Sequence, residues 1–71
     1  MTEKEKVEMF NEEGNDGKLC NWETWPKGEA DTGVIEGPAR LAESGCFWLA
    51  VVNVRMSGGI VRMVALDSIW Y

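Results

Sequence analysis

The chain contains no histidine, so the commonest general base and metal ligand is absent from its 71 residues. Its two cysteines, Cys20 and Cys46, lie 26 positions apart, a spacing that matches no zinc motif. Either thiol would also lack the base that usually activates a cysteine nucleophile. We interpret both as buried thiols that act as small hydrophobic side chains, without a disulfide in a reducing cytosol. The sequence therefore predicts a non-enzyme with no catalytic residue, no metal site and no cofactor.

Long apolar runs are also absent. No stretch of 18 apolar residues is present, which predicts no membrane span. The N-terminus is rich in Glu and Lys, which predicts no signal peptide and a cytoplasmic protein. Basic residues are few, with seven Lys and Arg, twelve Asp and Glu, and a formal net charge of −5. Because a general nucleic-acid binder gains affinity from a basic stripe, this balance argues against nucleic acid as a partner.

The negative charge is unevenly distributed. Residues 1–37 hold ten acidic residues and four Lys, whereas residues 38–71 hold two acidic residues and three Arg. One interpretation is an acidic face that binds a basic protein, for example by imitating nucleic acid. The other, which we favour, is an ordinary solvated half, because surface charge mainly sets solubility and association rate.

The segment from Cys46 to Tyr71 predicts one long β-hairpin with arms 46–56 and 60–70. The even positions of the first arm are apolar, which is typical of a strand face that packs on a core. The odd positions of the second arm are apolar as well, apart from Asp67. A two-residue Gly58-Gly59 turn would pair Val54 with Met63 and Trp48 with Ile69, and would place both apolar sets on one side.

The opposite face of this hairpin changes along its length. Near the turn it carries Arg55 and Arg62, which the predicted register places across from each other. These arginines can hold a carboxylate or phosphate of a partner, or they can extend into water. Toward the wide end the face is apolar, so we expect barrel curvature, the N-terminal helix or another subunit to cover it.

The pattern before the hairpin predicts a helix over residues 1–14, with Thr2 as its cap and Gly14 as its stop. Residues 18–25 alternate and predict a strand that ends at Pro26. Residues 27–32 are expected to form an acidic loop and residues 33–36 a short strand. Residues 37–45 fit either a two-turn helix, by local propensity, or a bent strand, by the overall layout.

Together these segments predict a single domain over residues 1–71. Its class is mainly β with an N-terminal helix (α+β), and residues 18–71 form a small bent antiparallel sheet or open barrel. The helix precedes Val34-Ile35-Glu36-Gly37, then Phe47-Trp48-Leu49-Ala50-Val51, Ile60 to Val64 and a closing Val64-Ala65-Leu66-Asp67-Ser68-Ile69-Trp70-Tyr71. This order resembles the Sm-like small barrels, in which a helix caps five bent strands.

The resemblance implies subunit rings and RNA binding by residues near the last turn. That turn is Asp67-Ser68 in this chain. The eukaryotic-type family has an Arg-Gly pair there, and the bacterial RNA chaperone has a Lys-His pair. The acidic residue argues against RNA binding and leaves the barrel and the subunit pairing as expectations.

We predict a small acidic protein-interaction module that self-associates through its apolar C-terminal hairpin and forms a homo-oligomer. One alternative is an acidic inhibitor, of the kind that phages and mobile elements encode, which blocks a basic nucleic-acid-binding protein. The other alternative is an Sm-like RNA-binding protein. Aromatic residues and arginine are enriched at interface hot spots. The residues expected to carry the interaction are Trp25, Phe47, Leu49, Arg55, Arg62, Leu66, Trp70 and Tyr71.

Overall fold

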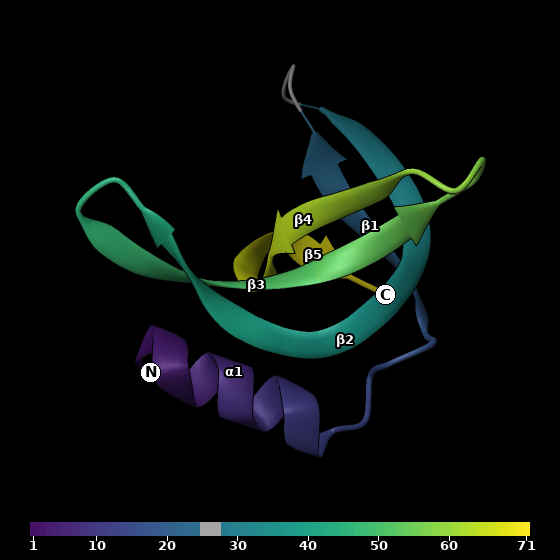
Figure 1. The fold of residues 1–71 in the computed structure, drawn as a ribbon. Coiled ribbons are helices and arrows are strands. Elements are labelled where there is room, and N and C mark those ends of the chain that lie inside the picture. Colours follow the sequence, from purple (N-terminus) through teal and green to yellow (C-terminus); the bar gives the residue numbers. More distant parts are fainter. Residues whose placement is uncertain (25–27) are drawn as a thin grey trace.

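The computed structural model describes residues 1–24 and 28–71. Its elements in chain order are α1 (Glu3–Glu12), β1 (Leu19–Thr24), β2 (Glu29–Ser44), β3 (Phe47–Met56), β4 (Val61–Ala65), the 3-10 turn η1 (Leu66–Ser68) and β5 (Ile69–Trp70). The five strands form an antiparallel sheet in the order β4-β3-β2-β1-β5 (Figure 1). This arrangement confirms the predicted α+β class, with an N-terminal helix and a bent, mostly β domain. Among the described residues, no helix combines the length and the apolar stretch that a membrane crossing needs.

The sheet curls because its two edge strands are neighbours in the chain. β4 and β5 lie at opposite edges, yet only the three residues of η1 join them. The curvature comes from β2, whose 16 residues sweep in an arc around the interior (Figure 1). Its pairing with β3 is interrupted between Glu36 and Arg40. Pro38 lies in this interruption, where no N–H is needed for the ladder. Residues 37–45, which fitted either structure, are therefore mostly strand.

The core fills the inside of this curl, and α1 closes one side of it. Phe10 of α1 packs with inward side chains of the first four strands; these are Cys20, Trp22, Ile35, Ala39, Val52, Val54 and Val64. Cys20 is buried as predicted, and Trp22, on the same face of β1, is buried as well. The predicted helix is confirmed with its cap, because Thr2 and Glu5 exchange side-chain to main-chain hydrogen bonds of 3.1 Å.

The predicted register of the C-terminal hairpin is wrong by one residue. Met56 N–H donates to the Ile60 carbonyl oxygen at 2.7 Å, so the turn contains Ser57 as well as both glycines. Val52 therefore pairs with Val64, and both side chains are buried. β4 has apolar residues on both faces, so the pattern alone accepts either register, and core packing selects this one.

The shifted register also separates the two arginines. Arg55 pairs with Val61, while Arg62 pairs with Val54, whose side chain is fully buried. Arg55 thus lies on the outer face of the sheet and Arg62 on the inner face. The prediction that they lie across from each other is wrong.

The predicted second arm, 60–70, is divided rather than continuous. β4 ends at Ala65, and after η1 Ile69 pairs with Trp22 of β1. Trp48, expected opposite Ile69, pairs with Glu43 of β2 instead. After Ala65 the chain no longer pairs with β3. The curled sheet brings β1 close to this end of β4, so that the last strand pairs with β1 instead. The predicted acidic loop is also wrong from Glu29 onward, because that residue starts β2 and pairs with Thr24.

Gly33 lies where β2 passes closest to β3. A Cβ atom at this position would be 2.6 Å from Val54 Cγ1 and 2.7 Å from the Arg55 carbonyl oxygen. The main chain of β3 cannot move aside as a flexible side chain could. At Gly37 the nearest atom to such a Cβ would be 3.8 Å away, which is an ordinary contact.

We expect Gly33→Ala to lower the free energy of unfolding by about 1–3 kcal/mol, because the added methyl group overpacks the β2–β3 contact. Urea denaturation followed by tryptophan fluorescence measures this change. The matched variant Gly37→Ala should stay within about 0.5 kcal/mol of the parent chain. Equal effects of the two substitutions would contradict the close approach at Gly33.

Candidate functional site

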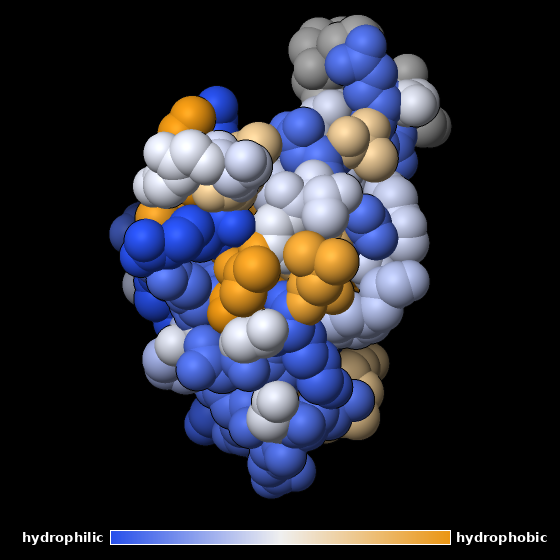
Figure 2. All heavy atoms as spheres, turned by 90° about the vertical axis from the view of Figure 1, so that its right-hand side faces the viewer, coloured by the Kyte–Doolittle hydropathy of each residue, from blue (hydrophilic) through white to orange (hydrophobic). Residues whose placement is uncertain are grey.

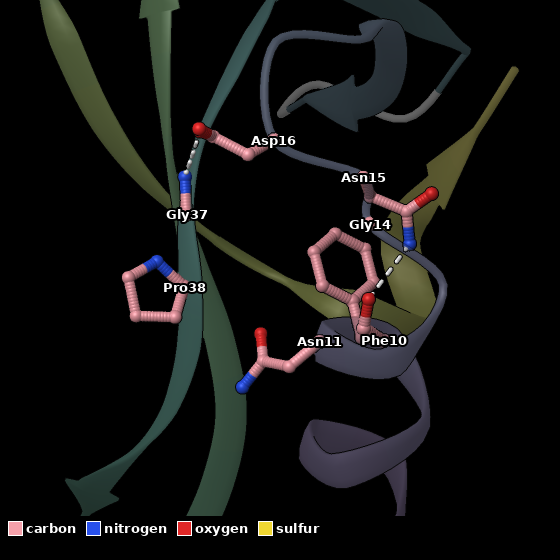
Figure 3. A pocket seen from close by; sticks show the side chains of 7 residues that line it. All are labelled: Phe10, Asn11, Gly14, Asn15, Asp16, Gly37 and Pro38. Atoms are coloured by element: carbon pink, nitrogen blue, oxygen red, sulfur yellow. Dashed lines mark hydrogen bonds between the residues drawn. The ribbon is translucent and has the colours of Figure 1, made fainter.

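The end of α1 and the turn after it hold the interrupted part of β2. Asn11 Oδ1 accepts a hydrogen bond from the Ala39 N–H at 2.8 Å, and Asn11 Nδ2 donates to the Ala39 carbonyl at 3.2 Å. Asp16 Oδ1 accepts from the Gly37 N–H at 2.8 Å (Figure 3). Because the β3 ladder is interrupted here, these side chains satisfy main-chain groups that β3 leaves unpaired.

A pocket of about 270 Å³ lies at this helix–sheet junction (Figure 3). Its lining residues are Phe10, Asn11, Gly14, Asn15, Asp16, Gly37 and Pro38. The buried Asn15 donates to the Phe10 carbonyl at 3.1 Å and accepts from Lys18 Nζ at 2.9 Å. Asn11, Asn15 and Asp16 are therefore all engaged in holding the fold. Each polar side chain of the pocket is thus tied to the fold through at least one hydrogen bond.

The start of α1 is fixed by a group of three charges. Lys6 Nζ lies 2.6 Å from Glu3 Oε2 and 2.8 Å from Asp67 Oδ2 of η1. Glu3 Oε1 also accepts from the Ala50 N–H of β3 at 3.1 Å. The Lys6 ammonium, followed by the Ala50 N–H, holds the pKa of the Glu3 carboxyl below its ordinary value of 4.5. Asp67 and then Glu3 raise the pKa of Lys6 above its ordinary value of 10.5.

The outer face of the sheet carries a row of exposed residues that crosses four strands and is apolar apart from Arg55. Leu19, Val34, Arg55 and Val61 follow one another across β1 to β4 in the observed register. Arg55 is neutralised locally, since it donates to both carboxylate oxygens of Glu36 at 2.8 and 3.2 Å. On the side that bears the β3–β4 turn and the bend of β2, hydrophobic side chains lie among hydrophilic ones (Figure 2).

β4 is an edge strand, and none of the described strands pairs with its far side. Hydrogen-bonded pairs alternate in antiparallel strands, so the Met56–Ile60 pair implies that Arg62 and Val64 bond to β3. The N–H and C=O groups of Val61 and Met63 then point away from β3. Val61 is 45% exposed and Met63 is 58% exposed. β4 therefore offers unpaired main-chain groups beside apolar side chains.

The other predicted interaction residues do not gather at one site. Phe47 is exposed at the free end of the β2–β3 hairpin, whereas Leu49 and Leu66 are half-buried. Trp70 and Tyr71 are exposed beside β1, with Lys18 Nζ 5.9 Å from the centroid of the Tyr71 ring. Trp25 lies outside the described residues.

Two residues expected in the core lie at the surface. Trp48 is 58% exposed and Cys46 is exposed at the start of the hairpin arm. Both lie beyond the point where β3 pairs with β4, so the inner side of the curl does not reach them. Cys20 is buried as predicted, and burial raises the pKa of its thiol. Neither cysteine forms a disulfide.

The structure also assembles a polar site that the predicted register concealed. Arg62 lines a pocket of about 260 Å³ together with Trp22, Thr24 and Asp31. We call this pocket the mouth pocket. A three-residue β3–β4 turn, in place of the predicted two-residue turn, would have placed Arg62 on the same face as Val54. The length of this turn is therefore the sequence feature from which the pocket could have been predicted.

Among the described residues, no group of three or more His, Cys, Asp or Glu could hold a metal ion. Comparison with protein-family models, curated proteins and solved structures finds nothing that matches this chain. Function therefore has to be inferred from the β4 edge, the mouth pocket and the charged surface.

We expect Asn11→Ala to lower the free energy of unfolding by about 1–3 kcal/mol, because it leaves the N–H and C=O of the buried Ala39 without partners. Thermal unfolding followed by circular dichroism provides the measurement. Glu12→Ala, at the next and exposed position of α1, is the control and should have little effect. A stable Asn11→Ala variant would mean that water replaces the side chain at the β2 interruption.

Stability should fall on acidification below about pH 4.5. The pKa of Glu3 is lowered in the folded chain, so the unfolded chain binds more protons as the pH falls, and the stabilisation is lost through the folded pKa. The raised pKa of Lys6 keeps its contribution present until alkaline pH. Urea midpoints measured between pH 3 and 8 should show a weaker acid dependence for Glu3→Gln than for Glu8→Gln. Identical pH profiles for the two variants would rule out the Glu3–Lys6 contact as a source of the acid dependence of stability.

Proposed function

We propose that this chain is a non-catalytic protein-interaction module that self-associates through the β4 edge of its C-terminal hairpin. The observation that carries the proposal is the combination of unpaired main-chain groups with exposed Val61 and Met63 on β4. Natural edge strands are commonly protected by charged side chains such as lysine, by proline or by a bulge. The charged residue of β4, Arg62, lies on the inner face and leaves the outer face apolar.

A second copy of the chain suits this edge because it brings the same unpaired strand and the same apolar side chains. Contact between two β4 strands is isologous and gives a dimer. Contact between β4 of one copy and β5 of the next is heterologous and gives a ring when the rotation closes. A ring is what the resemblance to Sm-like barrels implies. Both forms bury apolar surface and therefore resist salt. The proposed location is the cytoplasm.

Size-exclusion chromatography with light scattering, at low and high salt, tests the proposal. We expect a salt-resistant oligomer for the parent chain and a lower mass for Met63→Lys, because a charge would then stand on the edge. Met63→Pro should act in the same direction, since the lost N–H is one that points away from β3. Met9→Lys, an exposed apolar position on α1, should leave the mass unchanged.

Circular dichroism of each variant verifies that a lower mass does not come from unfolding. A parent chain that stays monomeric at all salt and protein concentrations would refute self-association. Oligomers that persist in both Met63 variants would place the contact elsewhere on the surface.

A second candidate function is inhibition of a basic nucleic-acid-binding protein by the acidic half of the chain. Glu8, Glu12 and Glu13 are exposed on α1 and at its cap, and none of them forms an ion pair among the described residues. These three carboxylates differ from that of Glu3, which is bound to Lys6 and to the Ala50 N–H within the fold. Salt-sensitive binding to a basic nuclease-type protein would support this function, and salt-insensitive or absent binding would count against it.

A further inference from the structure

Arg62 occupies an unusual place for an arginine. Its neighbour on β3 is Val54, a fully buried residue, and both side chains lie on the inner face of the sheet. The next inward position of β4 is Val64, which belongs to the core. A guanidinium group therefore stands where the apolar interior of the curl opens to solvent.

The mouth pocket around Arg62 is built from three strands. Trp22 and Asp31 are direct partners in the β1–β2 register, so their side chains share the inner face, and Thr24 is two residues further along it. Arg62 reaches the same space from β4, three strands away from β1 in the sheet order. Only the curl of β2 brings these groups together.

Two opposite charges thus line one small space without neutralising each other. Asp31 and Arg62 form no ion pair or side-chain hydrogen bond, with each other or with any other residue in the described ranges 1–24 and 28–71. The other two arginines differ, since Arg55 is bound to Glu36 and Arg40 donates to Asn53. As far as the described residues are concerned, the guanidinium and the carboxylate of the mouth pocket keep their hydrogen-bonding capacity for another molecule.

We propose that the mouth pocket binds a small zwitterion, namely a free α-amino acid. Its carboxylate pairs with the Arg62 guanidinium, whose planar donors match a carboxylate in a bidentate geometry. Its ammonium group binds the Asp31 carboxylate, and its carbon atoms lie against Trp22 and Thr24. This site is separate from the outer face of β4 and goes beyond self-association.

The burial of Trp22 and the volume of the pocket favour a small ligand of this kind. Trp22 is only 6% exposed, which leaves little of its ring for a nucleobase to stack on. A volume of about 260 Å³ has room for a molecule of amino-acid size. The charge pair then favours a molecule that carries both charges close together over a simple anion or cation.

Titration of the ¹⁵N-labelled chain with alanine, followed by NMR, tests the proposal. We expect a saturable shift of the Trp22 indole N–H signal with a dissociation constant of about 1 mM or below, as suits a ligand of so few atoms. Alanine methyl ester lacks the carboxylate and N-acetylalanine lacks the ammonium group. Each should bind at least about tenfold more weakly, because one charged hydrogen-bonding group of the pocket is then unpaired.

Two variants test whether Arg62 binds the carboxylate of the ligand and Asp31 its ammonium group. Arg62→Gln should remove the preference for alanine over its methyl ester, and Asp31→Asn the preference over N-acetylalanine. Arg55→Gln, on the outer face, is the matched control and should bind alanine like the parent chain. Absence of a saturable shift up to about 50 mM alanine, or unchanged binding by both pocket variants, would overturn the proposal.

Discussion

The bend of β2 is the constraint on which the rest of this structure depends. Gly33 allows β2 to pass against the main chain of β3, and the interruption between Glu36 and Arg40 lets the strand change direction. An interrupted ladder inside a protein leaves main-chain groups that must find other partners. Asn11 and Asp16 supply these partners, so α1 does more than cover apolar side chains. The helix and the curl therefore stabilise each other.

The charges of the chain divide into two groups because of this arrangement. Glu3, Lys6 and Asp67 connect α1 to η1, and Glu3 reaches β3 as well. These groups hold the helix on the sheet next to η1, beyond the last residue pair of β3 and β4. The exposed acids of α1 take no part in such contacts and give the surface its negative character. A net charge of −5 is thus partly structural and partly available to a partner.

The shift of one residue in the β3–β4 register separates two surfaces with different chemistry. It turns Val61 and Met63 outward, where they accompany the unpaired main chain of the β4 edge. The same shift turns Arg62 inward, opposite Trp22 and Asp31 across the mouth pocket. An apolar edge suits a second copy of the chain, while a pocket with two opposite charges suits a small polar molecule. The two proposals therefore draw on opposite faces of one strand.

The sequence by itself determined the features that depend on neighbouring residues. These are the capped helix that stops at Gly14, the strand that follows it and the α+β class, because capping, turn preference and period-two alternation act within a few positions. Only the tertiary structure decided the register of the hairpin and the fact that residues 29–32 form a strand. It also decided the exposure of Cys46 and Trp48 and the presence of Arg62 and Asp31 in one pocket. Each of these depends on which strand lies opposite, and β4 carries apolar residues on both faces, so its local pattern suits two registers. Packing of Val64 against Val52 inside the curl selects one of them, because it buries both side chains.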